Sequence, residues 1–246
     1  MAMRLTGVGV GPGDPELVTV KGVRVLRAAG AVVVPVMDSG ELGRAEATVR
    51  HYVPESAVVR VVFALNERTD RARREAAWDA AGARVAELLR AHGTVAFATI
   101  GDPNVYSTFT YLAGTVSGLL GDGEPLTVET VPGITAMQDL AARSGAVLAE
   151  GTEPLTLVPV TAGAAVLKDA LEGPGTVVAY KFGRLAAEVA AALRATGRTE
   201  GAVWGSSLGL PEESIRSAAE LPDGPLPYLS TLIAPARRDG GRGGKL

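Results

Sequence analysis

The chain has 246 residues, of which 47% are apolar and 21% are charged, and its formal net charge is −3. It contains no cysteine, which excludes disulfides, thiolate zinc sites, iron–sulfur clusters and cysteine nucleophiles. Its two histidines are too few for a histidine-rich metal site. The slightly acidic balance argues against general binding to nucleic acid. We therefore expect neither a metal nor a nucleic-acid partner.

Runs rich in β-branched residues alternate with helical patterns in the first part of the chain. The runs predict strands at 5–10, 31–34, 58–63, 94–99 and 126–131. Apolar residues spaced three and four positions apart predict helices at 16–29, 68–92, 103–120 and 135–144. Near-continuous apolar strands separated by helices are typical of a parallel sheet covered on both faces, so the pattern predicts an α/β fold.

A loop-like stretch at 145–154 then interrupts the pattern and predicts a domain boundary. We expect an N-terminal domain at 1–148, a C-terminal domain at 149–236 and a disordered Gly/Arg-rich tail at 237–246. The C-terminal domain has predicted strands at 155–159, 176–181 and 201–206, a helix at 185–196, and extended segments at 213–219 and 227–235.

Neither the start of the chain nor its interior predicts a membrane segment. The first five residues lack the apolar core of a signal peptide. The longest uncharged run, 103–121, carries too many Asn, Ser and Thr side chains to cross a bilayer. We expect a cytoplasmic protein without membrane association.

Glycine-bearing junctions follow three of the predicted strands. The first reads GVGVGPGDPEL at 7–17, with Asp14 placed to cap a helix that Pro15 opens. Its spacing matches neither the dinucleotide-binding G-x-G-x-x-G pattern nor a phosphate-binding P-loop. The second reads TIGDPNVYST at 99–108, where Asp102 is again placed to cap a helix that Pro103 opens. The third reads VPGITA at 131–136. Because the carboxyl ends of parallel strands share one edge of a sheet, the three junctions predict a small-molecule site there.

Other patterns allow competing interpretations. The sequence GSSLG at 205–209 matches the nucleophile elbow of hydrolases, but that motif needs a later histidine, and both His51 and His92 precede it. The arginines at 68–74 predict either a salt-bridged helix start or a contact to an acidic substrate. Lys181 ends an apolar strand, where it is either simply exposed or a ligand contact.

The three junctions in this order, followed by YLSTLI at 228–233, resemble those of the tetrapyrrole (corrin/porphyrin) methyltransferases. The resemblance extends from about residue 4 to residue 235. It implies two α/β domains of the non-Rossmann tetrapyrrole methylase type, with a mostly parallel sheet in the first and a mixed sheet in the second. It further implies that S-adenosyl-L-methionine (SAM) binds in the cleft between the domains and leaves as S-adenosyl-L-homocysteine (SAH).

The resemblance also implies which residues contact SAM. In the first domain these are Pro12, Gly101, Asp102, Val105, Ser107, Thr135 and Ala136. In the second domain they are Gly205, Thr231 and either Tyr180 or Lys181, which the resemblance implies approach the adenine. No catalytic base is singled out. Because the implied substrate carries eight carboxylates, Arg68 and Arg71, with Arg73 and Arg74, are the candidates to hold it.

Within the family, these motifs are most similar to those of enzymes that methylate carbon 20 of precorrin-2, giving precorrin-3A in cobalamin biosynthesis, and the implied assembly is a homodimer. Two alternatives stay open. One is methylation of cobalt-factor II or of another ring carbon of a corrin precursor. The other is a non-catalytic nucleotide- or SAM-binding module. RNA methylation is disfavoured by the acidic pI of about 5.5.

Overall fold

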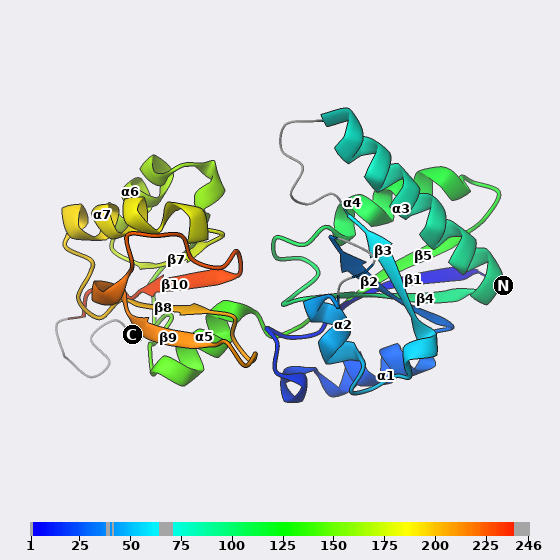
Figure 1. Ribbon diagram of the computed structural model, residues 1–246, viewed down its shortest axis with the longest axis horizontal. Helices are drawn as coiled ribbons and strands as arrows, with labels where there is room; N and C mark the ends of the chain where they lie inside the picture. The colour runs from blue at the N-terminus through cyan, green and yellow to red at the C-terminus, as the bar shows by residue number, and fades with distance from the viewer. Residues whose placement is uncertain (1, 38–39, 41, 64–70, 239–246) are drawn as a thin grey trace. The chain divides into compact units, whose positions relative to one another are not determined.

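The computed structural model describes residues 2–37, 40, 42–63 and 71–238 (Figure 1). The chain divides into two compact units, residues 1–135 and 136–246, each with its own five-stranded sheet. The division falls after Thr135, earlier than the predicted boundary at residue 148. Each unit is described below by itself.

The first unit is built on a wholly parallel sheet, as the sequence predicts. Its strand order is β3-β2-β4-β1-β5. The strands are β1 (Met3–Gly9), β2 (Ala31–Val36), β3 (Val58–Val62), β4 (Thr94–Thr99) and β5 (Leu126–Val131). The order places the carboxyl ends of β4, β1 and β5 next to one another, which fixes where the loops that follow them lie.

Helices cover both faces of this sheet, because its central strands β1, β2 and β4 are buried on both sides (Figure 1). One face packs against α1 (Val20–Ala28) and α2 (Arg44–Val49), with Val8 among the buried residues. The other face packs against α3 (Arg71–His92) and α4 (Phe109–Leu120), with Phe97 fully buried. Burying such a side chain contributes about 1.5–3 kcal/mol to folding.

The helix predicted at 16–29 is wrong in its first turn, which is a separate short element. A 3₁₀ helix, η1 (Pro15–Leu17), follows Asp14, whose carboxylate accepts from the backbone N–H of Glu16 at 2.8 Å. The backbone is then extended at Val18, and Thr19 caps α1 by accepting from the N–H of Gly22 at 3.0 Å. Two caps five residues apart therefore make two helices out of one apolar stripe.

Two features of the first unit, α2 and the 3₁₀ helix η2 (Glu55–Ala57), were not predicted, because each is too short to show a period. The sequence pattern also missed α6 in the second unit, which begins after Gly163 without a side-chain cap. The predicted start of α3 at residue 68 lies outside the described residues.

The buried carboxylate of Glu46 on α2 ties that helix to the sheet. Its side chain is 1% exposed and accepts from Arg60 on β3 at 2.6 and 3.0 Å. Arg50 lies 2.7 Å from the same carboxylate. The Arg60 hydrogen bond, opposed in part by burial, holds the pKa of Glu46 below its ordinary value of 4.5. Because the folded pKa is lowered, this pair stabilises the protein most above pH 4.5.

We expect Glu46→Gln to lower the free energy of unfolding by about 1–3 kcal/mol near neutral pH, because the two arginines lose their charged partner. The difference between wild type and variant should shrink as the pH falls below 4.5 and the wild-type carboxylate becomes protonated. Urea unfolding of both proteins at several pH values measures it. A difference that stays constant down to acidic pH would contradict the assignment.

The second unit has a mixed sheet of order β6-β7-β10-β8-β9. Its strands are β6 (Leu155–Pro159), β7 (Thr176–Tyr180), β8 (Val203–Ser206), β9 (Ser214–Ser217) and β10 (Ser230–Ala234). Only β6 and β7 pair in parallel, whereas β10 is antiparallel to both β7 and β8, and β9 is antiparallel to β8. The mixed sheet implied by the family resemblance is confirmed.

Helices on opposite faces explain why the division precedes the predicted boundary. The helices α6 (Ala164–Glu172) and α7 (Ala186–Thr196) bury one face of the sheet. The helix α5 (Ala136–Ser144) buries the other, where Leu140 packs with Val178 and Ile233. The pattern that predicted α5 does not say which sheet it covers, and its apolar side belongs to the second unit.

The predicted disordered tail begins too early. Arg238 donates to the carboxylate of Glu153 at 2.6 Å and to the carbonyl of Val147 at 3.2 Å. Arg237 donates to the carbonyl of Thr196 at 2.7 Å. Both arginines are therefore anchored in the second unit, and the rest of the predicted tail, 239–246, lies outside the described residues. Among the residues that the structure describes, no helix has the length and apolarity needed to cross a membrane.

Candidate functional site

The three glycine-bearing loops meet in the first unit, as predicted. Because β4, β1 and β5 are neighbours, the loops that leave their carboxyl ends run side by side. The N–H of Val10 donates to the carbonyl of Thr99 at 2.9 Å, and the N–H of Gly101 donates to the carbonyl of Gly11 at 2.8 Å. The first two loops are therefore joined by backbone hydrogen bonds beyond the end of the sheet.

Close backbone packing explains two of the glycines. A Cβ atom on Gly9 would lie 2.4 Å from the carbonyl oxygen of Gly101, and one on Gly133 would lie 2.1 Å from the same oxygen. These glycines let the three loops touch one another. Gly101 differs, because its φ is +71° and a Cβ there would meet only the Cα of Thr135, at 3.9 Å. Of the three, Gly101 is the one with open space beside it, which is what a ligand-facing position requires.

Asp102 holds the second and third loops together. It is 9% exposed, and its two carboxylate oxygens accept from the backbone N–H groups of Asn104 at 2.8 Å and of Gly133 at 3.0 Å. The prediction that Asp102 caps a helix opened by Pro103 is wrong, since α4 begins only at Phe109. The reason is that the carboxylate binds a distant N–H in the third loop instead of a following helical turn.

Ser107 lies next to Thr108, the N-cap residue of α4. Its hydroxyl accepts from the N–H of Phe109 at 3.2 Å and lies 3.1 Å from the hydroxyl of Thr99. Both oxygens belong to the second junction, so this loop is held at its two ends. Pro12 in the first loop is buried, and Val105 between Asp102 and Ser107 is half-buried.

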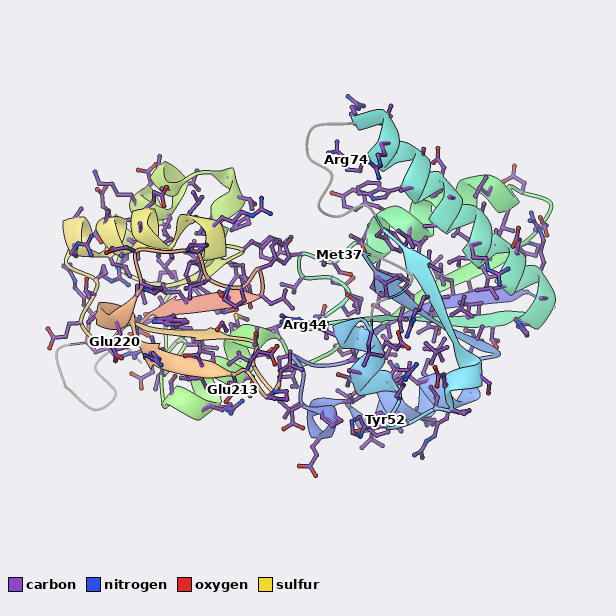
Figure 2. All side chains as sticks on the ribbon, in the orientation of Figure 1. Met37, Arg44, Tyr52, Arg74, Glu213 and Glu220 are labelled. Carbon is purple, nitrogen blue, oxygen red and sulfur yellow. The ribbon has the colours of Figure 1, made fainter. Side chains whose placement is uncertain are left out.

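Two side chains of the α2 region hold the first loop from outside. The buried hydroxyl of Thr48 donates to the carbonyl of Gly13 at 3.3 Å. The phenol of Tyr52, a residue labelled in Figure 2, donates to the carbonyl of Pro15. Sequence reasoning missed both, because nothing in the local sequence relates 48 and 52 to the first junction.

In the second unit, three of the predicted SAM residues form one row across the sheet. Tyr180 on β7 lies directly opposite Thr231 on β10, and Thr231 lies directly opposite Gly205 on β8. A Cβ atom on Gly205 would lie 3.0 Å from a methyl carbon of Leu140, so the row faces α5. The Tyr180 phenol accepts from the N–H of Met137 in the first turn of α5, at 3.2 Å.

Left-handed backbone at non-glycine residues is confined, among the described residues, to three positions. These are Tyr106 (φ 53°), Lys181 (φ 58°) and Ser207 (φ 51°). Each lies in the loop that follows a strand, namely β4 in the first unit and β7 and β8 in the second. Such conformations cost about 1–3 kcal/mol each and cluster at binding and catalytic sites. The sequence analysis named Lys181 as a candidate ligand contact, whereas Tyr106 and Ser207 entered it only as members of the TIGDPNVYST and GSSLG motifs.

The remaining predicted residues are placed as follows. Thr135 is buried and ends the first unit, whereas Ala136 begins α5 and the second unit. Arg71 is 81% exposed at the start of α3 and pairs with Glu75 one turn later at 2.6 Å. The sequence analysis left two interpretations of this segment open, a salt-bridged helix start and a contact to an acidic substrate. The ion pair is what the first of them predicts. Arg68 lies outside the described residues.

Comparison with known proteins identifies the family. The model of the Tetrapyrrole (Corrin/Porphyrin) Methylases matches residues 4–222 of this chain. The chain belongs to this family. This tetrapyrrole methylase is 32% identical to the cobalt-precorrin-2 C(20)-methyltransferase of Salmonella typhimurium, over 94% of this chain and 95% of that protein. It is 30% identical to a precorrin-2 C(20)-methyltransferase of Sinorhizobium sp, over 96% of each chain.

Solved structures agree with the fold of this tetrapyrrole methylase. A uroporphyrin-III C-methyltransferase from Thermus thermophilus, solved as a complex with S-adenosyl homocysteine, superposes with a TM-score of 0.63 at 24% identity. The match covers 94% of this chain and 97% of that one. The α/β architecture implied by the motifs, with a parallel sheet first and a mixed sheet second, is therefore confirmed.

Proposed function

We propose that this tetrapyrrole methylase is a SAM-dependent enzyme that transfers a methyl group to carbon 20 of precorrin-2, giving precorrin-3A in cobalamin biosynthesis. The observation that carries the proposal is the similarity to two C(20)-methyltransferases over nearly the full length of each chain. Methylation of another ring carbon and a non-catalytic binding module have no comparable support.

The chemistry fits a site made of backbone and small polar side chains. SAM supplies an electrophilic methyl group, which carbon 20 attacks before it loses its proton, and SAH is the other product. The protein must align donor and acceptor and exclude water, and needs no covalent help of its own. Gly101 leaves room beside its backbone, and the loop around it is fixed by Asp102 and Ser107. Such a fixed loop can hold the donor in one orientation.

Residues of both units contribute to SAM binding in this proposal. The first unit supplies Pro12, Gly101, Asp102, Val105, Ser107 and Thr135, and the second supplies Ala136, Gly205, Thr231 and either Tyr180 or Lys181. The convergence of the three loops supports the first set, and the row formed by Tyr180, Thr231 and Gly205 supports the second.

Incubation with SAM and precorrin-2 tests the function, with cobalt-precorrin-2 and cobalt-factor II as parallel substrates and mass spectrometry as the readout. We expect a mass gain of one methyl group on a precorrin-2 substrate, with an equal amount of SAH. The substrate that is methylated fastest shows whether the enzyme acts on the metal-free or on the cobalt-containing tetrapyrrole. Competent SAM binding without methylation of any tetrapyrrole would instead favour the binding module.

We expect SAM binding to survive exhaustive chelation. Within the described ranges, no three His, Asp or Glu residues are grouped so that they could hold a metal ion. The candidate site offers backbone groups, hydroxyls and one carboxylate that is already occupied by two N–H donors. Calorimetric titration of SAH before and after treatment with EDTA measures this. A loss of affinity that added metal restores would contradict it.

Arg71 remains our proposed contact for the substrate carboxylates, together with Arg68. Charge reversal, Arg71→Glu, should raise the KM for the tetrapyrrole and leave the SAH affinity unchanged. The effect should weaken with salt, because Arg71 is exposed and the screening length is about 8 Å at physiological ionic strength. Arg84→Glu, on the same helix and also exposed, is the matched control. An unchanged KM for Arg71→Glu would show that Arg71 does not contact the substrate carboxylates.

We further propose a homodimer in the cytoplasm, following the family resemblance. Light scattering of the purified protein across a concentration series tests the assembly, and a monomeric mass at all concentrations would overturn it.

A further inference from the structure

A buried hydroxyl without a described partner belongs to Ser207. This residue follows β8 directly and lies two residues after Gly205, which forms a row across the sheet with Thr231 and Tyr180 (the SAM row). Ser207 is 1% exposed, and its hydroxyl oxygen makes no hydrogen bond with any described residue. Buried polar groups are nearly always paired, because leaving one unpaired loses the hydrogen bonds it makes to water. The Ser207 hydroxyl therefore has an unused hydrogen-bonding capacity that a partner from outside the chain can satisfy.

The backbone at Ser207 gives a second, independent indication. Its φ of 51° is left-handed, a conformation that costs a residue with a Cβ atom free energy that glycine avoids. Glycine stands two residues on either side, at Gly205 and Gly209, but not here. A serine that carries both backbone strain and an unpaired buried hydroxyl is poorly explained by folding alone.

The loop that presents Ser207 is held rigidly. The N–H of Leu210 donates to the carbonyl of Ser207 at 3.0 Å, closing a tight turn. The N–H of Gly209 donates to the carboxylate of Glu213, a residue labelled in Figure 2, at 2.8 Å. Glu213 in turn makes a two-pronged ion pair with Arg143 on α5. The loop of Ser207 is therefore fixed to α5, the helix that faces the SAM row. A binding group that is held in place in this way loses little conformational freedom when the ligand binds.

We propose that the hydroxyl of Ser207 hydrogen-bonds a polar atom in the adenosine part of SAM. The inference rests on the proposed function and adds a residue that the family motifs did not point to. It assigns Ser207 to the same portion of the ligand as Gly205, two residues earlier, and Thr231 opposite Gly205. It also gives a role to the GSSLG sequence, whose serine hydroxyl is buried and whose loop joins β8 to β9, not to the helix that a nucleophile elbow requires.

The test compares two orphaned hydroxyls in the same unit. Thr199 also has a buried hydroxyl without a described partner, but it precedes β8, whereas Ser207 follows that strand. Ser207→Ala and Thr199→Val each remove one hydroxyl, and calorimetry gives the affinity of each variant for SAM and for SAH. Thermal unfolding of the free proteins runs in parallel.

We expect Ser207→Ala to lower the affinity for SAM and for SAH about fivefold each, which corresponds to the loss of one neutral hydrogen bond. The two ligands should be affected equally because both carry adenosine. Its melting temperature should stay equal or rise, since the removed hydroxyl is unpaired without ligand. Thr199→Val should bind both ligands like wild type. Equal affinities of Ser207→Ala and wild type, or equal weakening by both variants, would overturn the role of Ser207 and leave the proposed function standing.

Two other outcomes are distinct. A loss by Ser207→Ala that is confined to SAM would place the contact at the methyl-bearing sulfur and overturn the adenosine assignment. Failure of the wild type to bind either ligand would overturn the proposed function, and the Ser207 contact with it.

Discussion

Replacement of Asp102 by alanine is expected to lower the free energy of unfolding by about 3 kcal/mol and to abolish measurable SAM binding. The carboxylate accepts from the N–H groups of Asn104 and Gly133, and its loss leaves both part-buried hydrogen bonds without their charged acceptor. Hydrogen bonds to charged groups contribute about 1.5–3 kcal/mol each. Urea unfolding and SAH titration of Asp102→Ala measure the two effects, and binding should fail at temperatures where the variant is still folded.

Asp14→Ala is the matched control for this variant. Asp14 also accepts from a backbone N–H two residues later, that of Glu16 at 2.8 Å, but within the described part of the chain it makes no second bond to another loop. Its loss should cost about 1 kcal/mol, as for an ordinary helix cap, with SAM binding retained. If both variants lost stability equally and bound SAH equally well, Asp102 would be reduced to a turn residue.

The second large effect is expected for Gly133→Ala. The new Cβ atom would lie 2.1 Å from the carbonyl oxygen of Gly101 and 2.7 Å from the Cα of Gly9, and neither backbone can move without the loop that carries it. Overpacking of this kind costs about 1–3 kcal/mol or more. We expect a loss near the upper end together with loss of SAM binding, measured by urea unfolding and SAH titration.

Gly123→Ala provides the comparison, because a Cβ atom there would have no neighbour within 4 Å. It should change the free energy of unfolding by no more than about 0.5 kcal/mol and leave SAH affinity intact. A Gly133→Ala variant as stable as Gly123→Ala would show that the three loops do not pack as tightly as the structure indicates.

The strands of the first unit were predictable because their apolar pattern is local. A run such as Ala31–Val34 is buried on both faces, and only a covered parallel sheet satisfies that. The convergence of the three loops then followed from the rule that parallel strands end at one edge. Strand order was not needed for that prediction, although it decides which loops touch.

The helix starts were less predictable, because the local signals compete with distant partners. Asp102-Pro103 reads as a helix cap, yet the carboxylate binds the N–H of Gly133, 31 residues away. No local pattern contains that contact. The same limit applies to α5, whose period predicts a helix but does not reveal which of two sheets its Leu140 covers.

The site residues of the second unit came from the family resemblance and could not have come from spacing. Tyr180, Gly205 and Thr231 are brought into one row only by antiparallel pairing of β10 with β7 and β8. Ser207 was singled out by its sequence, but for a hydrolase motif that lacks a histidine. Its burial and its left-handed backbone, which redirect the interpretation, are visible only in the structure.

The position of the transferred methyl group tests the central claim most directly. Incubation with precorrin-2 and SAM carrying a carbon-13 methyl group, followed by NMR of the isolated product, identifies the ring carbon that was labelled. We predict a single new labelled methyl on carbon 20. A label on any other ring carbon, or no labelled tetrapyrrole from a protein that binds SAM, would contradict the assignment.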